Sequence, residues 1–184
     1  LPDQAAYDGF RGGLPVAWLD CFHERFYRER TALAERDPEG WHALMGPYPE
    51  LLTLLRRRAG DTQLAIATAK DRRSVRALLA RYGAADLFLD ERVLDKEAGV
   101  SKREHLEALS ARSGFAFPDI TFVDDKLNHL QGAAGLGVRC ALATWGYNSR
   151  REAAAARERG FLVCTLQDFD AQIFSQRRGA AVSQ

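Results

Sequence analysis

Cysteine and methionine are scarce in this chain. Its 184 residues include three cysteines and one methionine, and Cys21, Cys140 and Cys164 are widely spaced and form no metal-binding pattern. The low number and wide spacing exclude a disulfide-rich secreted scaffold and a cysteine-ligated zinc site. Cys140 and Cys164 lie within apolar runs, so we expect them to be buried thiols of a protein in a reducing compartment, the cytoplasm.

An excess of charge of one sign is also missing. The 26 basic and 25 acidic residues give a formal net charge of +1, so charge provides no reason to expect nucleic acid or an anionic membrane as a partner. No apolar run has the length of a membrane span, and no signal peptide is recognisable. Apolar residues make up 46% and charged residues 28% of the chain, as is typical of a globular domain.

From residue 47 onward, short apolar runs alternate with patterns of helical spacing. This alternation is typical of βαβ units that form a parallel sheet with helices on both faces. We predict an α/β fold with a Rossmann-like parallel sheet sandwiched by helices over residues 47–176, followed by a polar tail at 177–184. The strands are expected at residues 63–68, 87–89, 120–123, 138–143 and 161–164.

The first 46 residues have a different pattern. Residues 1–13 contain three glycines and are expected to be irregular. Trp18, Leu19 and Phe22 then follow helical spacing, which predicts a helix through about residue 36. A turn is expected at residues 37–40. We interpret residues 1–46 as an N-terminal segment with a small helical cap insertion.

The stretch around Asp124 and Asp125 is the most informative about chemistry. Residues 120–123 read as a buried strand, the two carboxylates follow directly, and a helical pattern begins after them. Ligands of open α/β sheets bind at the carboxyl ends of the strands. Adjacent carboxylates repel each other unless a proton or a cation lies between them, and Mg²⁺ is held by a few carboxylates with water and phosphate oxygens. A magnesium and phosphate site is predicted; the alternative is a solvated acidic loop at a helix N-terminus.

Two further strand or helix ends are expected at the same edge of the sheet. Thr68 ends a strand and offers a hydroxyl, and the backbone N–H groups of Ala69 and Lys70 follow. Lys102 is at a predicted helix N-terminus, where a cation is unfavourable unless an anion lies nearby. A hydroxyl, an ammonium and a carboxylate pair are the groups that phosphoryl transfer uses. A threonine in this position is also common as a turn residue, and Lys70 and Lys96 are rivals for the role of Lys102.

In the order Thr, Lys, Asp-Asp, the chain resembles the haloacid dehalogenase (HAD) superfamily of phosphohydrolases. Thr68 in Leu-Ala-Ile-Ala-Thr is similar to its second motif, and Lys102 in Ser-Lys-Arg-Glu-His-Leu to its third. The acidic stretch Phe-Val-Asp-Asp-Lys-Leu-Asn, ending at Asn128, is similar to the fourth. The resemblance implies a HAD-like core, Mg²⁺ as the cofactor and a small phosphorylated substrate.

The resemblance also implies roles for single residues. Asp125 would be a direct metal ligand and Asp124 a supporting one, while Asn128 would orient the loop or a metal-bound water. Thr68 and Lys102 would act on the phosphoryl group, with the N–H of Ala69 beside them. Where this chain has a histidine directly after Asn128, the family often has a further acid. The substrate, the choice between phosphatase, dehalogenase and phosphonatase, and the oligomeric state stay open.

The nucleophile of the family is missing from the sequence. HAD enzymes attack phosphorus with the first aspartate of an Asp-x-Asp motif, and no Asp-x-Asp precedes Thr68. One expectation is that the motif lies upstream of Leu1, on a strand that the family places between the strands of Thr68 and Asp124; without it, the sheet would have a gap. A second is that Asp20 is a degenerate nucleophile, with Phe22 where the acid–base aspartate should be. A third is a non-catalytic HAD-like domain that binds a phosphorylated ligand or a protein partner.

Another class of small α/β protein, the phospho-receiver domain, also has an acidic pair, a threonine and a lysine. There the acidic pair comes first, whereas here it comes last, so the order of the groups argues against that class.

Overall fold

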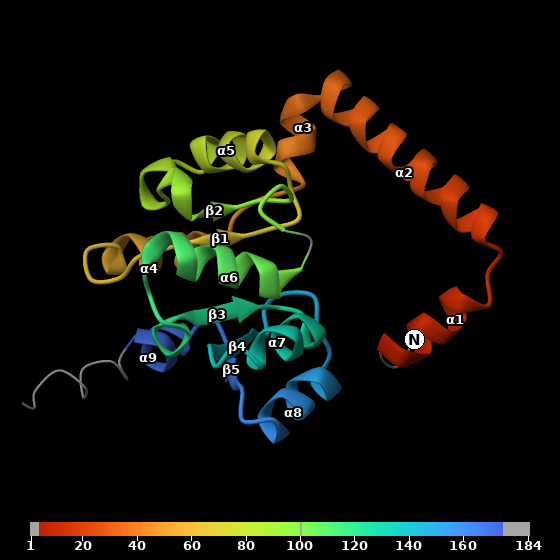
Figure 1. Cartoon of the computed structure of the whole chain (residues 1–184). Coiled ribbons are helices and arrows are strands. Elements are labelled where there is room, and N and C mark those ends of the chain that lie inside the picture. Colours follow the sequence, from red (N-terminus) through yellow and green to blue (C-terminus); the bar gives the residue numbers. More distant parts are fainter. Residues whose placement is uncertain (1–3, 100, 175–184) are drawn as a thin grey trace, which may run out of the picture. The chain divides into compact units, whose positions relative to one another are not determined.

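The computed structural model describes residues 4–99 and 101–174 (Figure 1). By its internal contacts, the chain divides into two units, Leu1–Tyr48 and Pro49–Gln184, which we call the N-terminal unit and the core unit. The polar tail expected at residues 177–184 lies outside the described residues.

The described part of the N-terminal unit is helical and comprises α1 (Gln4–Gly12), α2 (Val16–Arg36) and α3 (Pro38–Ala43). Two expectations about this unit were wrong. Residues Gln4–Gly12 form a helix despite their glycines, which lower helix propensity without forbidding it. The expected turn at 37–40 instead begins α3, because the Asp37 carboxylate accepts a hydrogen bond from Gly40 N at 2.9 Å and Pro38 suits the first helical position.

The core unit alternates strands and helices, as the sequence pattern predicted. One predicted strand, at residues 87–89, was wrong: residues Ala85–Leu87 form the 3₁₀ turn η1, and the strand of this region is β2 (Val93–Leu94). Val93 and Leu94 are 2% and 0% exposed, whereas Leu89 is 49% exposed, so burial selected the later pair. The remaining elements are α4 (Pro49–Arg58), β1 (Ile66–Ala67), α5 (Arg72–Arg81), η2 (Asp90–Arg92), α6 (Lys102–Ser113), η3 (Phe117–Asp119), β3 (Thr121–Asp124), α7 (Leu127–Ala134), β4 (Arg139–Ala143), α8 (Arg150–Glu158), β5 (Leu162–Cys164) and α9 (Phe169–Phe174).

The strands form two parallel sheets, one with the order β1-β2 and one with the order β3-β4-β5. Alternation along β4 shows that helices cover both faces of the larger sheet. Cys140 and Leu142 pack into a cluster with residues of α6, α7 and α8, whereas Ala141, on the opposite face, packs with residues of α4 and α9. Cys140 and Cys164 are both buried, as expected. The predicted α/β architecture is therefore confirmed.

β1 and β3 each pair on one side only within the described residues, and their other edges line one cavity of about 540 Å³. Residues 63–67 form one wall of this cavity, and residues 119–125 form another. Helix α6 contributes His105 and Leu106, and helices α4 and α9 also contribute side chains. We call this space the inter-sheet cavity. It lies where the family resemblance places a further strand.

Candidate active site

The carboxyl ends of β1 and β3 are joined by the side chain of Lys102. This residue opens α6, whose N-cap is Ser101 with the capping box that the sequence predicts, completed by Glu104. The Lys102 ammonium donates to the carbonyl of Ala67 at 2.5 Å and lies 3.9 Å from Oδ2 of Asp124. One cation therefore contacts both strand ends, next to the position where Thr68 follows Ala67.

Lys102 is largely shielded from solvent, with its side chain 17% exposed. Burial lowers the pKa of its ammonium, while the carboxylates of Asp124 and Asp125 oppose that shift. A shielded ammonium at this edge is suited to bind an anion such as a phosphate group, provided that a cation offsets the charge of the two carboxylates.

Thr68 forms the turn after β1. Its N–H donates to the carbonyl of Leu94 at 2.8 Å, which extends the pairing with β2, and its hydroxyl oxygen accepts from Lys70 N at 3.1 Å. Because the oxygen accepts this bond, the hydroxyl proton remains available to an external acceptor. Ala69 is exposed at the tip of the turn. The rival lysine Lys96 is exposed and its charge acts on Asp71.

Asp124 ends β3 and is held by several donors. Its Oδ1 accepts from Lys126 N at 2.8 Å and lies 3.0 Å from Nδ1 of His129, which must carry the proton in this contact because a carboxylate only accepts. Its side chain is 10% exposed. No role was predicted for His129, although a position in the first turn of α7 is close enough to reach the end of β3.

Asp125 is held by the loop that follows β4. Its Oδ2 accepts from Tyr147 N at 2.6 Å, and Gly146 approaches so closely that an added Cβ would lie 2.2 Å from Cβ of Asp125. Lys126 lies over the Tyr147 ring at 4.0 Å from its centroid. This loop contact is a tertiary feature that no local sequence signal indicated.

Asn128, the third predicted metal ligand, is exposed in the first turn of α7. Two carboxylates and an amide at one strand end are hard oxygen donors, and Mg²⁺ typically takes one or two carboxylates together with phosphate oxygens and water. Asp124, Asp125 and Asn128 could therefore supply the protein ligands of a magnesium site. Within the described residues, however, no three His, Cys, Asp or Glu side chains are grouped as a metal site.

Asp20, the alternative nucleophile, is exposed within helix α2 of the N-terminal unit. A nucleophile of the expected type would follow a strand at the carboxyl edge of the sheet. The idea that Asp20 belongs to a degenerate strand motif is therefore wrong, and the physical reason is that the aromatic residues around it have helical spacing.

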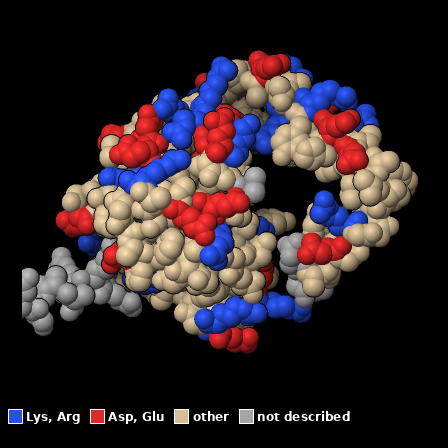
Figure 2. Space-filling model, in the orientation of Figure 1, with Lys and Arg blue, Asp and Glu red and all other residues tan. Residues whose placement is uncertain are grey.

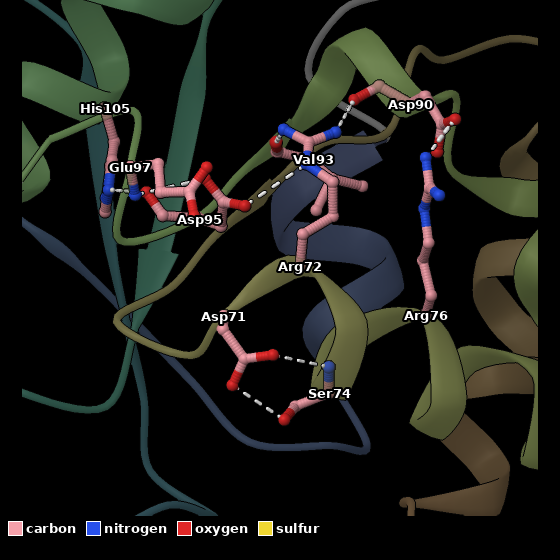
Figure 3. Close-up of polar contacts among 9 residues, drawn as sticks. All are labelled: Asp71, Arg72, Ser74, Arg76, Asp90, Val93, Asp95, Glu97 and His105. Atoms are coloured by element: carbon pink, nitrogen blue, oxygen red, sulfur yellow. Dashed lines mark hydrogen bonds and ion pairs between the residues drawn. The ribbon is translucent and has the colours of Figure 1, made fainter.

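A buried polar network lies beside α6 (Figure 3). It contains Arg72 of α5, Asp95 after β2 and His105 of α6, and the two last residues are 1% and 2% exposed. Burial raises the pKa of Asp95, but hydrogen bonds from Glu97 N–H and Arg72, together with the Arg72 charge, outweigh it and leave that pKa below its ordinary value. None of these three residues was predicted to have a functional role.

On the face shown in Figure 2, acidic and basic side chains are interspersed, in agreement with the nearly balanced composition. None of the helices in the described part of the chain combines the length and apolarity that crossing a membrane requires.

Comparison with known proteins finds a relative similar in sequence and a solved structure similar in fold. No family model matches the chain. It is 32% identical over 110 residues to a phosphoglycolate phosphatase of Synechococcus elongatus, a match that covers 58% of this chain and 49% of the relative, so it spans about half of that protein's length. A haloacid dehalogenase-like family hydrolase from Streptococcus pneumoniae has a similar fold, with a TM-score of 0.61, 15% identity, and coverage of 94% of this chain and 82% of that one. The chain is therefore similar in sequence to a phosphoglycolate phosphatase over part of that protein's length, and similar in fold to a haloacid dehalogenase-like hydrolase.

Proposed function

We propose that this chain carries most of the active site of a Mg²⁺-dependent phosphatase that hydrolyses a small phosphate ester through an aspartyl-phosphate. The observation that supports the proposal most directly is the Lys102 ammonium, which contacts Ala67 O beside Thr68 and faces Asp124. A phosphate group bound there would meet a hydroxyl and a cation, with two carboxylates available to hold a metal.

In the proposed reaction, the Thr68 hydroxyl and the N–H of Ala69 bind phosphate oxygens, and Lys102 neutralises part of their charge. A carboxylate oxygen attacks phosphorus, the bond to the ester oxygen breaks, and the departing alcohol takes up a proton. Water then cleaves the acyl-phosphate, which releases inorganic phosphate and restores the carboxylate. Asp124, Asp125 and Asn128 would hold Mg²⁺, which offsets negative charge on the phosphoryl group when it is bound.

The nucleophilic aspartate, in our proposal, belongs to a strand that occupies the inter-sheet cavity, and the sequence expectation assigns it to residues upstream of Leu1. Both walls of the cavity are strand edges, and a strand between them would pair with β1 and β3. His105 Nδ1 is a buried atom in the described part of the chain without a hydrogen-bond partner, and His105 lines this cavity.

The lining of the cavity also favours an occupant. It includes the apolar side chains of Leu55, Leu106 and Phe122 beside two strand edges, and apolar surface and strand edges are both better covered than left open. A strand between the two sheets would cover both.

The curated relative acts on phosphoglycolate, as its name states, so small phosphorylated acids are the first substrates to test. The buried thiols of Cys140 and Cys164 are compatible with a cytoplasmic protein. The second candidate function is a HAD-like domain that binds a phosphorylated ligand or protein partner without turnover. The lack of Asp-x-Asp before Thr68 is the observation that favours it.

The experiment begins with the intact mass of the protein purified from its source, because a mass clearly above 20.5 kDa means additional residues. Phosphate release from phosphoglycolate and related esters is then measured with Mg²⁺ and with EDTA. We expect turnover that EDTA and Asp125→Ala both abolish, while Asp61→Ala, at an exposed carboxylate, is the matched control. Magnesium and phosphate binding without turnover would favour the binding-only function, and turnover that survives Asp125→Ala would refute the proposed site.

A further inference from the structure

The network of Arg72, Asp95 and His105 connects the two helices whose N-termini border the candidate site (Figure 3). On one side, Arg72 Nε donates to Asp95 Oδ2 at 3.2 Å, and its terminal nitrogens donate to the carbonyls of Asp90 and Val93, each at 2.9 Å. All three guanidinium nitrogens of Arg72 are thus engaged. Because Arg72 is the first residue of α5, these bonds hold the start of that helix against β2.

On the other side, His105 Nε2 lies 2.9 Å from the carbonyl oxygen of Asp95. A carbonyl only accepts, so Nε2 carries the proton and donates. Ala98 N donates to the same oxygen at 2.9 Å, and Glu97 N donates to Asp95 Oδ1 at 3.2 Å. Asp95 therefore binds α5 through its carboxylate and α6 through its carbonyl.

Both helices follow loops of the candidate site. Helix α5 follows the Thr68 turn, and Lys96 N, next to Asp95, donates to the Lys70 carbonyl in that turn at 3.3 Å. In α6, Lys102 is three residues before His105, so the two side chains are neighbours on the same side of the helix. A displacement of His105 would move the first turn of α6 and the Lys102 stem with it.

We propose that the Arg72–Asp95–His105 network is a positioning element that sets the Thr68 turn and the Lys102 ammonium relative to each other, an inference that rests on the proposed phosphatase function. A buried ion pair is weak evidence for stability, because apolar side chains of similar volume often stabilise a fold as well or better. What the pair supplies here is directional bonding between two helix starts.

The test replaces His105 by leucine and by glutamine, and Arg72 by methionine. Leucine removes the donor to Asp95 O, glutamine keeps an amide nitrogen near the position of Nε2, and methionine keeps the apolar stem of Arg72 without its guanidinium. Circular dichroism checks that each variant folds, and Arg72→Met carries the test if His105→Leu does not fold. The NMR signal of the ¹³C-labelled side chain of Lys102 is compared with that of Lys126, which lies outside the network.

We expect the Lys102 signal to move in His105→Leu and Arg72→Met and to return in His105→Gln, while Lys126 stays unchanged. An unmoved Lys102 signal, or an equal displacement of Lys126, would overturn the proposal. This readout needs no turnover, so it stands apart from the outcome of the phosphatase assays.

A double-mutant cycle provides the second readout, the affinity for inorganic phosphate by calorimetry. His105→Leu is expected to weaken binding about tenfold in the parent protein and less than about twofold in a Lys102→Gln background, because the lost positioning acts through Lys102. Equal losses in both backgrounds would contradict the positioning role. If the parent protein binds no phosphate, the proposed function fails, whereas the Lys102 signal still decides about the network.

Discussion

Replacing Gly146 by alanine should disturb Asp125, because the loop after β4 passes unusually close to it. An added Cβ at Gly146 would lie 2.2 Å from Cβ of Asp125, and ordinary contact begins at 3.4 Å. Rotation about χ1 of Asp125 cannot relieve this overlap, since its Cβ is fixed to the backbone. The backbone of the loop must therefore move by about 1.2 Å.

A movement of that size stretches the hydrogen bond from Tyr147 N to Asp125 Oδ2 from 2.6 Å to about 3.8 Å, beyond hydrogen-bond length. Hydrogen bonds to charged groups contribute about 1.5–3 kcal/mol. We expect a loss of about 2 kcal/mol in the free energy of unfolding. For a domain of this size, such a loss corresponds to a Tm lower by about 4–8 °C.

Urea unfolding followed by circular dichroism measures this change. The matched control is Gly132→Ala, which adds the same atom in helix α7 with nothing within 4 Å, and which should stabilise the protein by about 0.5–1 kcal/mol. In an Asp125→Gly background, where the obstructing Cβ is gone, Gly146→Ala should cost much less. The steric reasoning is wrong if Gly146→Ala has the same free energy of unfolding as the parent protein. It is also wrong if Gly146→Ala lowers the free energy of unfolding as much in the Asp125→Gly background as in the parent protein.

Two further predictions concern titration and thiol chemistry. The pKa of Asp95 lies below its ordinary 3.8 in the folded protein, so its stabilising contribution is present above that value and is lost as pH falls through the folded pKa. In Asp95→Asn, the free energy of unfolding should fall less steeply with decreasing pH below about pH 4 than in the parent protein. Asp86→Asn, at an exposed carboxylate, is the control. An equally steep fall in Asp95→Asn and the parent protein would contradict the prediction. Burial raises the pKa of Cys140 and Cys164 to about 11, whereas Cys21 is exposed. A thiol reagent at pH 8 should therefore modify one cysteine quickly in the native protein and all three in urea, and rapid reaction of all three in the native state would refute it.

Local sequence patterns were sufficient for most of the core unit. The capping box at Ser101 and Glu104 marks the start of α6 in the sequence itself, because its hydrogen bonds span only three residues. The apolar run before Asp124 forms a strand, because a continuous β-branched segment of that length suits a sheet buried on both faces. The wrong strand prediction at residues 87–89 has the same cause, because local propensity favoured a strand there, whereas the strand forms at Val93–Leu94, which are buried.

The order of Thr68, Lys102 and the aspartate pair along the chain is a property of the sequence, and it carried the resemblance from which the fold was predicted. How their side chains meet is a property of the tertiary structure. The bond from Lys102 to the Ala67 carbonyl joins residues 35 positions apart, and the bond from Tyr147 N to Asp125 joins residues 22 positions apart. The network of Arg72, Asp95 and His105 is similar, because Asp95 lies 23 positions from Arg72 and 10 from His105, and no local pattern shows that these side chains meet. Local hydrogen bonds are encoded within a few residues, whereas burial and long-range contacts depend on the packing of the whole unit.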